Sequence, residues 1–484
     1  MKKSNNGNSK YTTLTKNMAL FTISSFGSKI LSFLLVPLYT QVFSTQEFGT
    51  ADLLTSTVAL LIPILTINIQ DAVLRFTLDK DYSADDVIST GIRINFAGSI
   101  LLLMALIVLK WTRILQLDVS LVMFLFFSFV FGSLNNCFTL YLKGKNKVPV
   151  LVVSGLLNTI LVCALNILLL AVFSTGILGY LIASVAGVVA AVGYQFFAGR
   201  IYKDIRLKKF TNLSMPMLKY SGPLIANSLA WWVNGTSGRY ILTLFSGVAA
   251  NGVFSIAYKI PTMLSTIQSI FYNAWSISAI TEFDANDKDG FIGKTYTMYS
   301  SISLLGCSLI MLLNIPLARL LYSGEFFMAW QCVPFLLVGT AFNGIALFQG
   351  CIFVAVKDTK EVSKTTIVGA CVNMLCNVVL IYFIGALGAA LAAMFAYIVT
   401  YVMRAVKLVR IIKMKVNWKN HICSCALLLV QAIFSTSEST VFLQTIVALL
   451  LLALQWKVLE KMLIRLRKWK ADKGGKKRSN RLEE

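Results

Sequence analysis

Charged residues are scarce in this sequence. Lys, Arg, Asp and Glu together make up 13% of its 484 residues, whereas 57% are apolar. The charged share is about half of what is usual in a soluble domain. A soluble protein of this size needs a charged surface, and a disordered chain is more polar than this one. The composition therefore excludes a disordered chain and argues against a soluble globule.

The usual signs of a disulfide framework or a metal site are also lacking. The nine cysteines fall mostly in apolar segments, without the spacing of either, and we interpret them as small buried hydrophobic side chains. His421, Cys423 and Cys425 come nearest to a metal cluster, but no fourth ligand accompanies them. Residues 293–295 match the last three residues of a phosphate-binding loop motif. However, Lys288 occupies the position at which that motif requires glycine. We expect no metal, no cofactor and no ATP hydrolysis.

Long apolar runs are abundant instead, and they recur from one end of the chain to the other. The backbone must satisfy its own hydrogen bonds inside lipid, so these runs predict an all-α polytopic membrane protein. No cleavable signal peptide is expected, because polar residues run to Lys16 and the first apolar segment is too long for one. Fourteen spans are predicted, at residues 16–43, 51–71, 89–109, 119–141, 149–173, 177–199, 220–245, 252–280, 295–315, 327–355, 365–384, 387–405, 421–435 and 441–457.

Lys and Arg are distributed unevenly between the segments that join these spans. If the N-terminus is cytoplasmic, nearly all of the 44 basic residues lie on the cytoplasmic side, and only Lys110, Arg113 and Arg319 lie on the other. Basic residues collect on the cytoplasmic side of membrane proteins, so both termini are predicted to be cytoplasmic. The outer segments are too short for a domain. This disfavours a membrane glycosyltransferase or polymerase, which usually builds its catalytic site on a large outer loop.

The two halves of the chain resemble each other weakly. Residues 47–51 correspond to residues 250–254, and residues 179–183 correspond to residues 388–392. Each half has six spans, so the halves run in the same direction, and this arrangement predicts two lobes with pseudo-two-fold symmetry around a central cavity. The predicted parts are a cytoplasmic N-terminal arm (1–15), an N-lobe (16–199), an inter-lobe loop (200–219), a C-lobe (220–405), two extra C-terminal helices (421–457) and a basic cytoplasmic tail (458–484).

Three basic residues lie within predicted spans. Lys29 is near the middle of the first span, where a charge costs about 3 kcal/mol on insertion scales, and Ser25 and Ser32 share its helical face. This polar stripe predicts contact with a water-filled cavity. The alternatives are a lysine held by a structural carboxylate and one that reaches towards the interface.

Arg239 and Lys259 lie at a similar depth on a predicted helical hairpin, each about 10 Å from the outer surface. Without an acid nearby in the spans, two such cations would bind a pyrophosphate or an acidic sugar. The alternative is that both side chains reach the outer lipid headgroups. Trp232, which follows Trp231, could stack on a sugar or a prenyl chain, although aromatic residues in a helix bundle more often serve packing.

Asp71 and Arg75 are one helical turn apart at the inner end of the second span. The simplest interpretation is an interfacial ion pair, and the functional alternative is a cytoplasmic gate. The tail after Lys457 is basic and is expected to bind anionic phospholipids of the inner leaflet. Nucleic-acid binding is not needed to explain its charge, because the membrane topology already does so.

Several segments resemble a known family. The sequences at residues 322–334, 355–359, 372–377 and 385–390 look like the second half of polysaccharide transporters of the multidrug/oligosaccharidyl-lipid/polysaccharide exporter superfamily. Residues 29–49 and 72–76 are similar to the first half of these proteins, and the resemblance covers roughly residues 14–457. It implies a flippase in the bacterial plasma membrane. Its substrate would be an undecaprenyl-pyrophosphate-linked oligosaccharide, the repeat unit of a capsule, O-antigen or exopolysaccharide.

The resemblance also implies a mechanism and partners. Alternating access through a cationic cavity would carry the headgroup, and a polysaccharide polymerase and a chain-length complex would act on the product. A cation-coupled multidrug exporter of the same superfamily is the alternative transporter. That activity needs buried carboxylates, whereas Glu47, Asp52, Asp71 and Glu282 all lie near the ends of spans. A scaffold for a polysaccharide assembly complex is the alternative without transport.

Overall fold

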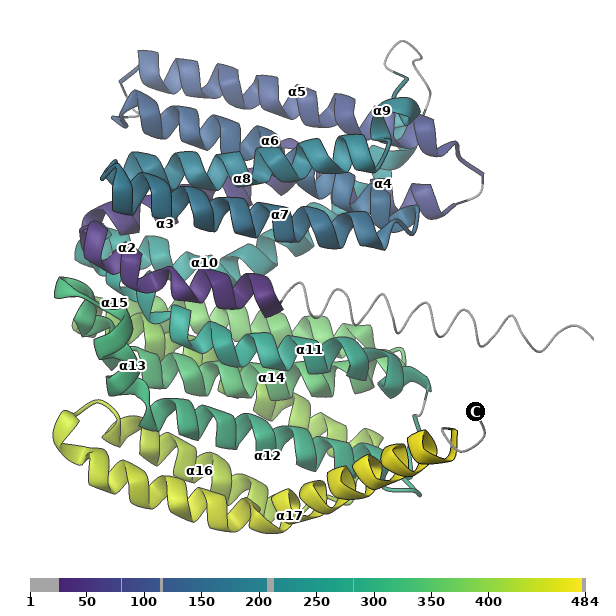
Figure 1. The fold of residues 1–484 in the computed structure, drawn as a ribbon, viewed down its shortest axis with the longest axis vertical. Helices are drawn as coiled ribbons and strands as arrows, with labels where there is room; N and C mark the ends of the chain where they lie inside the picture. Colours follow the sequence, from purple (N-terminus) through teal and green to yellow (C-terminus); the bar gives the residue numbers. More distant parts are fainter. Residues whose placement is uncertain (1–25, 80, 114–115, 207–212, 282, 481–484) are drawn as a thin grey trace, which may run out of the picture. The chain divides into compact units, whose positions relative to one another are not determined.

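The computed structural model describes residues 26–79, 81–113, 116–206, 213–281 and 283–480. Within these ranges the regular structure is helical throughout, which confirms the all-α class (Figure 1). A helix closes its backbone hydrogen bonds within one segment, which is what a lipid environment requires. The predicted N-terminal arm, the start of the first span and Ser25 lie outside the described residues.

The first described helix is Phe26–Val42, with a turn at Leu35. The others are α2 (Val36–Val42, the second part of that helix), α3 (Thr45–Leu65), α4 (Ile69–Leu78), α5 (Ala84–Trp111), α6 (Val119–Gly144), α7 (Val148–Asn166), η1 (Ile167–Val172), α8 (Gly176–Ala198), α9 (Ile201–Asp204), α10 (Ser214–Ala257), α11 (Lys259–Thr281), α12 (Phe291–Leu312), α13 (Asn314–Leu321), η2 (Gly324–Gln331), α14 (Val333–Ala355), α15 (Thr359–Ile411), α16 (Trp418–Phe434), η3 (Glu438–Thr440) and α17 (Val441–Asn480).

Ten helices of the described residues are long and apolar enough to cross a membrane. Two of them contain breaks near predicted turns between spans. In α10 the break is Gly247, with a φ of 86°, and in α15 it is Ile384 and Gly385, the latter with a φ of 55°. Glycine adopts these positive φ angles without steric cost. The multi-pass membrane class is confirmed, and the count of fourteen spans stays a prediction.

The second span differs from its prediction at both ends. Helix α3 begins at Thr45 because Ser44 and Glu47 form a capping box: the Glu47 backbone N–H donates to Ser44 Oγ over 3.2 Å, and the Ser44 N–H donates to the Glu47 carboxylate over 2.9 Å. The helix ends at Leu65, and Asn68 is in the left-handed region, with a φ of 51°. The last residues of the predicted span therefore belong to α4, a separate short helix.

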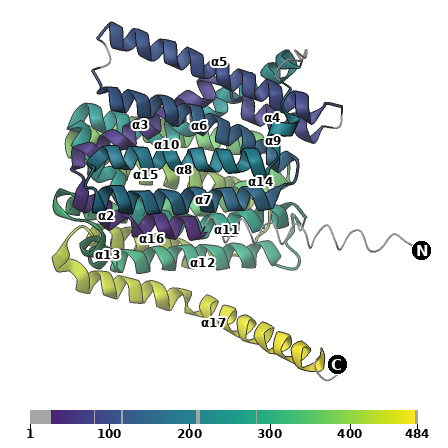
Figure 2. The same ribbon diagram turned by 45° about the horizontal axis from the view of Figure 1, so that its top comes forward.

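Packing divides the chain into two compact units. The first comprises residues 1–256 with 321–326, and the second comprises residues 257–320 with 327–484. In the first unit α6 lies between α5 and α8 (Figures 1 and 2). Buried residues from these three helices and from α3, such as Phe129 and Leu181, form a core there. In the second unit α14 is the most deeply buried of the long helices.

The two C-terminal helices, α16 and α17, lie beside α12 within the second unit (Figure 1), and buried hydrogen bonds join them to it. Ser301 Oγ donates to Gln455 Oε1 over 2.6 Å, and Gln455 Nε2 donates to Ser424 Oγ over 2.8 Å. Ser308 Oγ donates to Gln431 Oε1 over 2.6 Å. Lipid tails are as apolar as leucine, so such polar contacts help to hold membrane helices together. Helix α17 continues through most of the predicted basic tail.

Candidate functional site

A cluster of polar residues around Asp52 joins α3 to α10 in the first unit. Arg239 Nη1 lies 2.7 Å from Asp52 Oδ1, and Asn251 Nδ2 donates to Asp52 Oδ2 over 3.2 Å. Ser56, one turn further along α3, accepts a second bond from Arg239, over 3.3 Å. The Asp52 and Arg239 side chains are only 15% and 22% exposed, so water screens the ion pair less than it would at a surface.

Two aromatic residues of α10 flank this ion pair. The Trp232 indole N–H donates to the Ser56 carbonyl over 2.9 Å, and the Tyr240 hydroxyl lies 2.8 Å from Thr57 Oγ1. Their ring centroids are 5.3 Å apart, with the ring planes inclined at 50°. The polar edges of both rings are thus directed at α3. This geometry gives Trp232 a packing contact, and stacking on a sugar stays a proposal for it.

The ion pair corrects one premise about Arg239. The sequence argument assumed that no acid would be near it in the spans, but Asp52 neutralises its charge directly. The sequence argument treated Asp52 as an acid near the end of a span and gave it no role in binding. The spacing of Asp52 and Ser56, which places both on one face of α3, was the signal that could have identified this polar cluster. Lys259 is the first residue of α11, is half-buried and belongs to the second unit. The substrate-binding role of these cations therefore remains a proposal.

Lys29 is exposed and lies in the first described helix. Among the residues that the structure describes, no carboxylate forms an ion pair with it. Its surroundings are polar: Thr159 Oγ1 of α7 donates to Ser28 Oγ over 2.9 Å, and Ser32 Oγ donates to the Ser28 carbonyl over 2.9 Å. Ser32 is exposed like Lys29. Within the described part of the chain this lysine has no acid paired with it, and its contact with an anionic ligand stays a proposal.

The predicted ion pair between Asp71 and Arg75 is wrong. Asp71 instead accepts a hydrogen bond of 2.6 Å from Asn68 Nδ2, and Arg75 pairs with Asp79 at 3.6 Å. The reason is local: the left-handed Asn68 precedes α4 and reaches its first turn, while Asp79 ends that helix one turn beyond Arg75. A gating role for either residue stays a proposal.

Arg404 is the buried cation that the sequence argument missed, because it was grouped with the cytoplasmic charges at the end of its span. It is 5% exposed and donates to the Ala346 carbonyl over 2.7 Å and to Thr365 Oγ1 and Thr366 Oγ1, each over 3.0 Å. A side chain at Gly350 would place its Cβ 3.1 Å from the guanidinium. Arg404 therefore fastens α14 to both parts of α15 within the second unit.

His421, part of the weak metal-like sequence, is surrounded by hydroxyl groups. Its Nε2 atom lies 2.7 Å from the Tyr401 hydroxyl and 3.3 Å from that of Tyr296. The described residues contain no group of His, Cys, Asp and Glu that could hold a metal ion. His421 therefore belongs to the packing between α12, α15 and α16.

The ion pair between Asp52 and Arg239 makes a testable prediction. Each substitution removes one half of a partly buried charge contact, so Asp52→Asn and Arg239→Gln should each lower stability. The double variant should lose less than the sum of the two, with a coupling energy of about 1–3 kcal/mol. Unfolding of the purified variants, followed by intrinsic fluorescence, would measure it.

The matched control for this cycle is the pair of Arg319 and Glu438, which is 3.0 Å apart but 65% and 47% exposed. Exposed ion pairs contribute little, so its coupling should be below about 1 kcal/mol. Strictly additive effects at Asp52 and Arg239 would show that the contact stabilises nothing.

The chain is similar to known proteins in both sequence and structure. The model of a family described as "Polysaccharide biosynthesis protein" matches residues 14–277, more than half of the chain. No curated protein matches the sequence. A lipid II flippase in an inward closed conformation has a similar structure, with a TM-score of 0.71 and 14% identity, covering 92% of this chain and 100% of that one.

Two further solved structures share the fold. An inward-facing multidrug resistance transporter of the MATE family in the MOP superfamily has a TM-score of 0.63 and 13% identity, covering 81% of this chain and 99% of its own. A MOP superfamily transporter from Pyrococcus furiosus, described as having a binding pocket of reversed polarity, has a TM-score of 0.54 and 13% identity. It covers 82% of this chain and 96% of its own.

Proposed function

Because this chain belongs to the polysaccharide biosynthesis protein family and has the fold of MOP superfamily transporters, we propose that it is a lipid-linked oligosaccharide flippase. Its substrate would be an undecaprenyl-pyrophosphate-linked repeat unit of a capsule, O-antigen or exopolysaccharide. The movement would run from the inner to the outer leaflet of the bacterial plasma membrane. The observation that carries this proposal is the likeness to a lipid II flippase over that protein's whole length.

The extent of the structural matches supports a flippase over a drug exporter. The lipid II flippase covers 92% of this chain, whereas the MATE transporter covers only 81% although almost all of its own chain is matched. The share of this chain that the lipid II flippase matches is therefore larger. The two C-terminal helices are joined to α12 by buried hydrogen bonds, so they are an integral part of the second unit.

The charges of Asp52 and Lys29 also support a flippase over a cation-coupled exporter. A cation-coupled exporter needs a carboxylate that can release and take up a proton or a metal cation, and Asp52 is already engaged by Arg239 and Asn251. Protonating Asp52 would remove the charge attraction between Asp52 and Arg239, at a cost. An anionic pyrophosphate headgroup needs a cation instead, and Lys29 is the predicted contact with the clearest unpaired charge among the described residues.

The proposed mechanism is alternating access through a cationic cavity, as the internal repeat predicts. The headgroup would exchange its water for Lys29 and nearby hydroxyl groups, while the prenyl chain stays in lipid. Arg239, Lys259 and Trp232 are proposed as further contacts. The polymerase and the chain-length complex would receive the product on the outer side. Enzymatic alternatives lose support, because the structures that share the fold are those of transporters and flippases.

Reconstitution in vesicles tests this function. Vesicles with a fluorescent oligosaccharide-pyrophosphate-polyprenyl lipid in both leaflets are treated with an impermeant quencher, and the protected fraction is measured. The protein should remove this protection, because it brings inner-leaflet lipid to the outside. A fluorescent phosphatidylcholine is the control lipid and should stay protected. If the protein instead expels a cationic dye along an ion gradient and leaves the oligosaccharide lipid protected, the exporter alternative is correct.

A further inference from the structure

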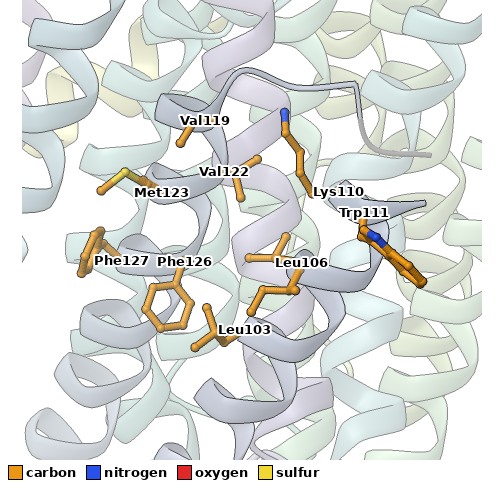
Figure 3. Close-up of a pocket in the computed structure, with 10 residues that line it drawn as sticks. Leu103, Leu106, Lys110, Trp111, Val119, Val122, Met123, Phe126 and Phe127 are labelled. Carbon is orange, nitrogen blue, oxygen red and sulfur yellow. The ribbon is translucent and has the colours of Figure 1, made fainter. Parts of the chain in front are cut away.

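Two apolar grooves run along the first unit on either side of α6. One lies between α5 and α6 with a volume of about 500 Å³, and the other lies between α6 and α8 with a volume of about 620 Å³. Met123 and Phe127 of α6 line both, so these two side chains form a ridge between the grooves. Figure 3 shows the first groove with this ridge at one side and Leu103 near Phe126.

The grooves are shaped for hydrocarbon chains. Their floors are core residues such as Leu106 and Phe124, and their walls are exposed apolar residues such as Ile107 and Ile182. In a protein that spans a membrane, such walls face lipid. The second groove follows α8 from Leu178 to Ala190, a rise of about 18 Å. This is close to the depth of one leaflet, which is half of a hydrocarbon core of about 30 Å.

A cation lies at one end of the first groove. Lys110 is in the last turn of α5, and its ammonium group, which donates to the Leu117 carbonyl, lies at the upper end of the groove in Figure 3. That bond uses one of the three N–H donors and leaves two for a ligand. Trp111 beside it is 84% exposed, as expected for an aromatic residue at headgroup level.

The positive-inside pattern does not explain this lysine. Lys110 lies on the side that the charge distribution predicts to be extracytoplasmic, where basic residues are few. Its place in the last turn of α5 accounts for a favourable interaction with the helix carbonyls. It does not account for the apolar groove that Lys110 lines, or for the second groove on the other side of Met123 and Phe127. An apolar groove with an ammonium group at its end is complementary to a lipid phosphate with its chain.

We propose that this surface binds one anionic diacyl phospholipid, with a chain in each groove and the phosphate at Lys110. The occupant follows from the geometry: two grooves flank a single ridge, and a diacyl phospholipid has two chains on one glycerol, which carries a single phosphate. A polyprenyl phosphate has one chain and would fill one groove. The site is independent of the transported substrate, because all of its residues lie on α5, α6 and α8 and none is among the proposed headgroup contacts.

Native mass spectrometry of the full chain in detergent tests the proposal. Phosphatidylglycerol, its single-chain lyso form, phosphatidylcholine and a polyprenyl phosphate are added separately at equal concentration, and inorganic phosphate is added to the phosphatidylglycerol complex as a competitor. Phosphatidylglycerol should be retained about five-fold more than phosphatidylcholine, since an exposed charge pair contributes modestly. It should also exceed the lyso form, which fills one groove. Equal retention of the lyso form or preferential retention of the polyprenyl phosphate would overturn the two-chain site, and displacement by inorganic phosphate would overturn a lipid site.

Variants locate the binding. Lys110→Gln should reduce phosphatidylglycerol retention about five-fold, whereas Arg319→Gln, the same change at another predicted outer cation, should leave it unchanged. Ala186→Phe fills the second groove and should reduce retention of the diacyl lipid without affecting the lyso form. Ala171→Phe, on an exposed position outside both grooves, is its control. Retention that is unchanged in both Lys110→Gln and Ala186→Phe would place the bound lipid elsewhere and refute the proposal.

Discussion

Lys29→Ala is expected to abolish export of the polysaccharide while the protein still reaches the membrane. An anionic headgroup that leaves water needs a compensating charge, and polar groups alone leave it costly. Lys29→Gln keeps polarity without charge and should behave like the alanine variant, while Lys29→Arg should retain part of the activity. Membrane insertion should improve in the neutral variants, because a charge leaves an apolar segment. Polymer at the cell surface and protein in the membrane fraction are measured together.

The control for Lys29 is Lys360→Ala, which removes an exposed charge at the start of α15 and should leave export at the wild-type level. Arg239→Gln provides a second comparison with the Lys29 variants. The structure pairs Arg239 with Asp52, so its loss should lower stability as well as export, whereas Lys29 variants should lose export without losing stability. Wild-type polymer from Lys29→Gln, at wild-type protein levels, would show that this cation does not contact the substrate.

Gly252→Ala is expected to prevent accumulation of folded protein. Helices α3 and α10 cross so closely that a Cβ at Gly252 would lie 1.9 Å from the Thr45 carbonyl oxygen, and one at Gly49 would lie 2.1 Å from the Val248 carbonyl oxygen. Backbone atoms cannot turn away as a flexible side chain can, so the helices would have to separate. Overpacking typically costs about 1–3 kcal/mol and occasionally more, and a clash between two backbones belongs at the upper end of that range. Separation would also stretch the bonds from Asp52 to Arg239 and Asn251.

A matched control lies on the same helix. A Cβ at Gly235 of α10 would have no atom within 4 Å, so Gly235→Ala should be neutral or should stabilise the helix by about 0.5–1 kcal/mol. Gel filtration of fluorescent fusions and thermal unfolding of the purified variants would compare the two. If Gly252→Ala elutes and unfolds like Gly235→Ala, the close crossing of α3 and α10 is not a feature of the folded protein.

The crossing also shows how sequence and structure complement each other. Gly49 and Gly252 occupy corresponding positions of the internal repeat that the sequence predicts from residues 47–51 and 250–254. The structure adds that the two glycines meet, and that their contact is reciprocal: each would strike the carbonyl four residues before the other. A repeat identifies equivalent positions, but it does not state which of them touch.

The sequence by itself determined the helical class, the membrane setting and the family. These depend on composition and on runs of apolar residues, because a backbone in lipid must close its hydrogen bonds within each segment whatever its neighbours are. Only the tertiary structure decided the partners of the buried charges. Arg239 pairs with Asp52 far away in the chain, and Arg404 is held by a carbonyl of α14 and hydroxyl groups of α15. Such contacts depend on which helix faces meet, and hydropathy along one chain carries no information about the face of another helix.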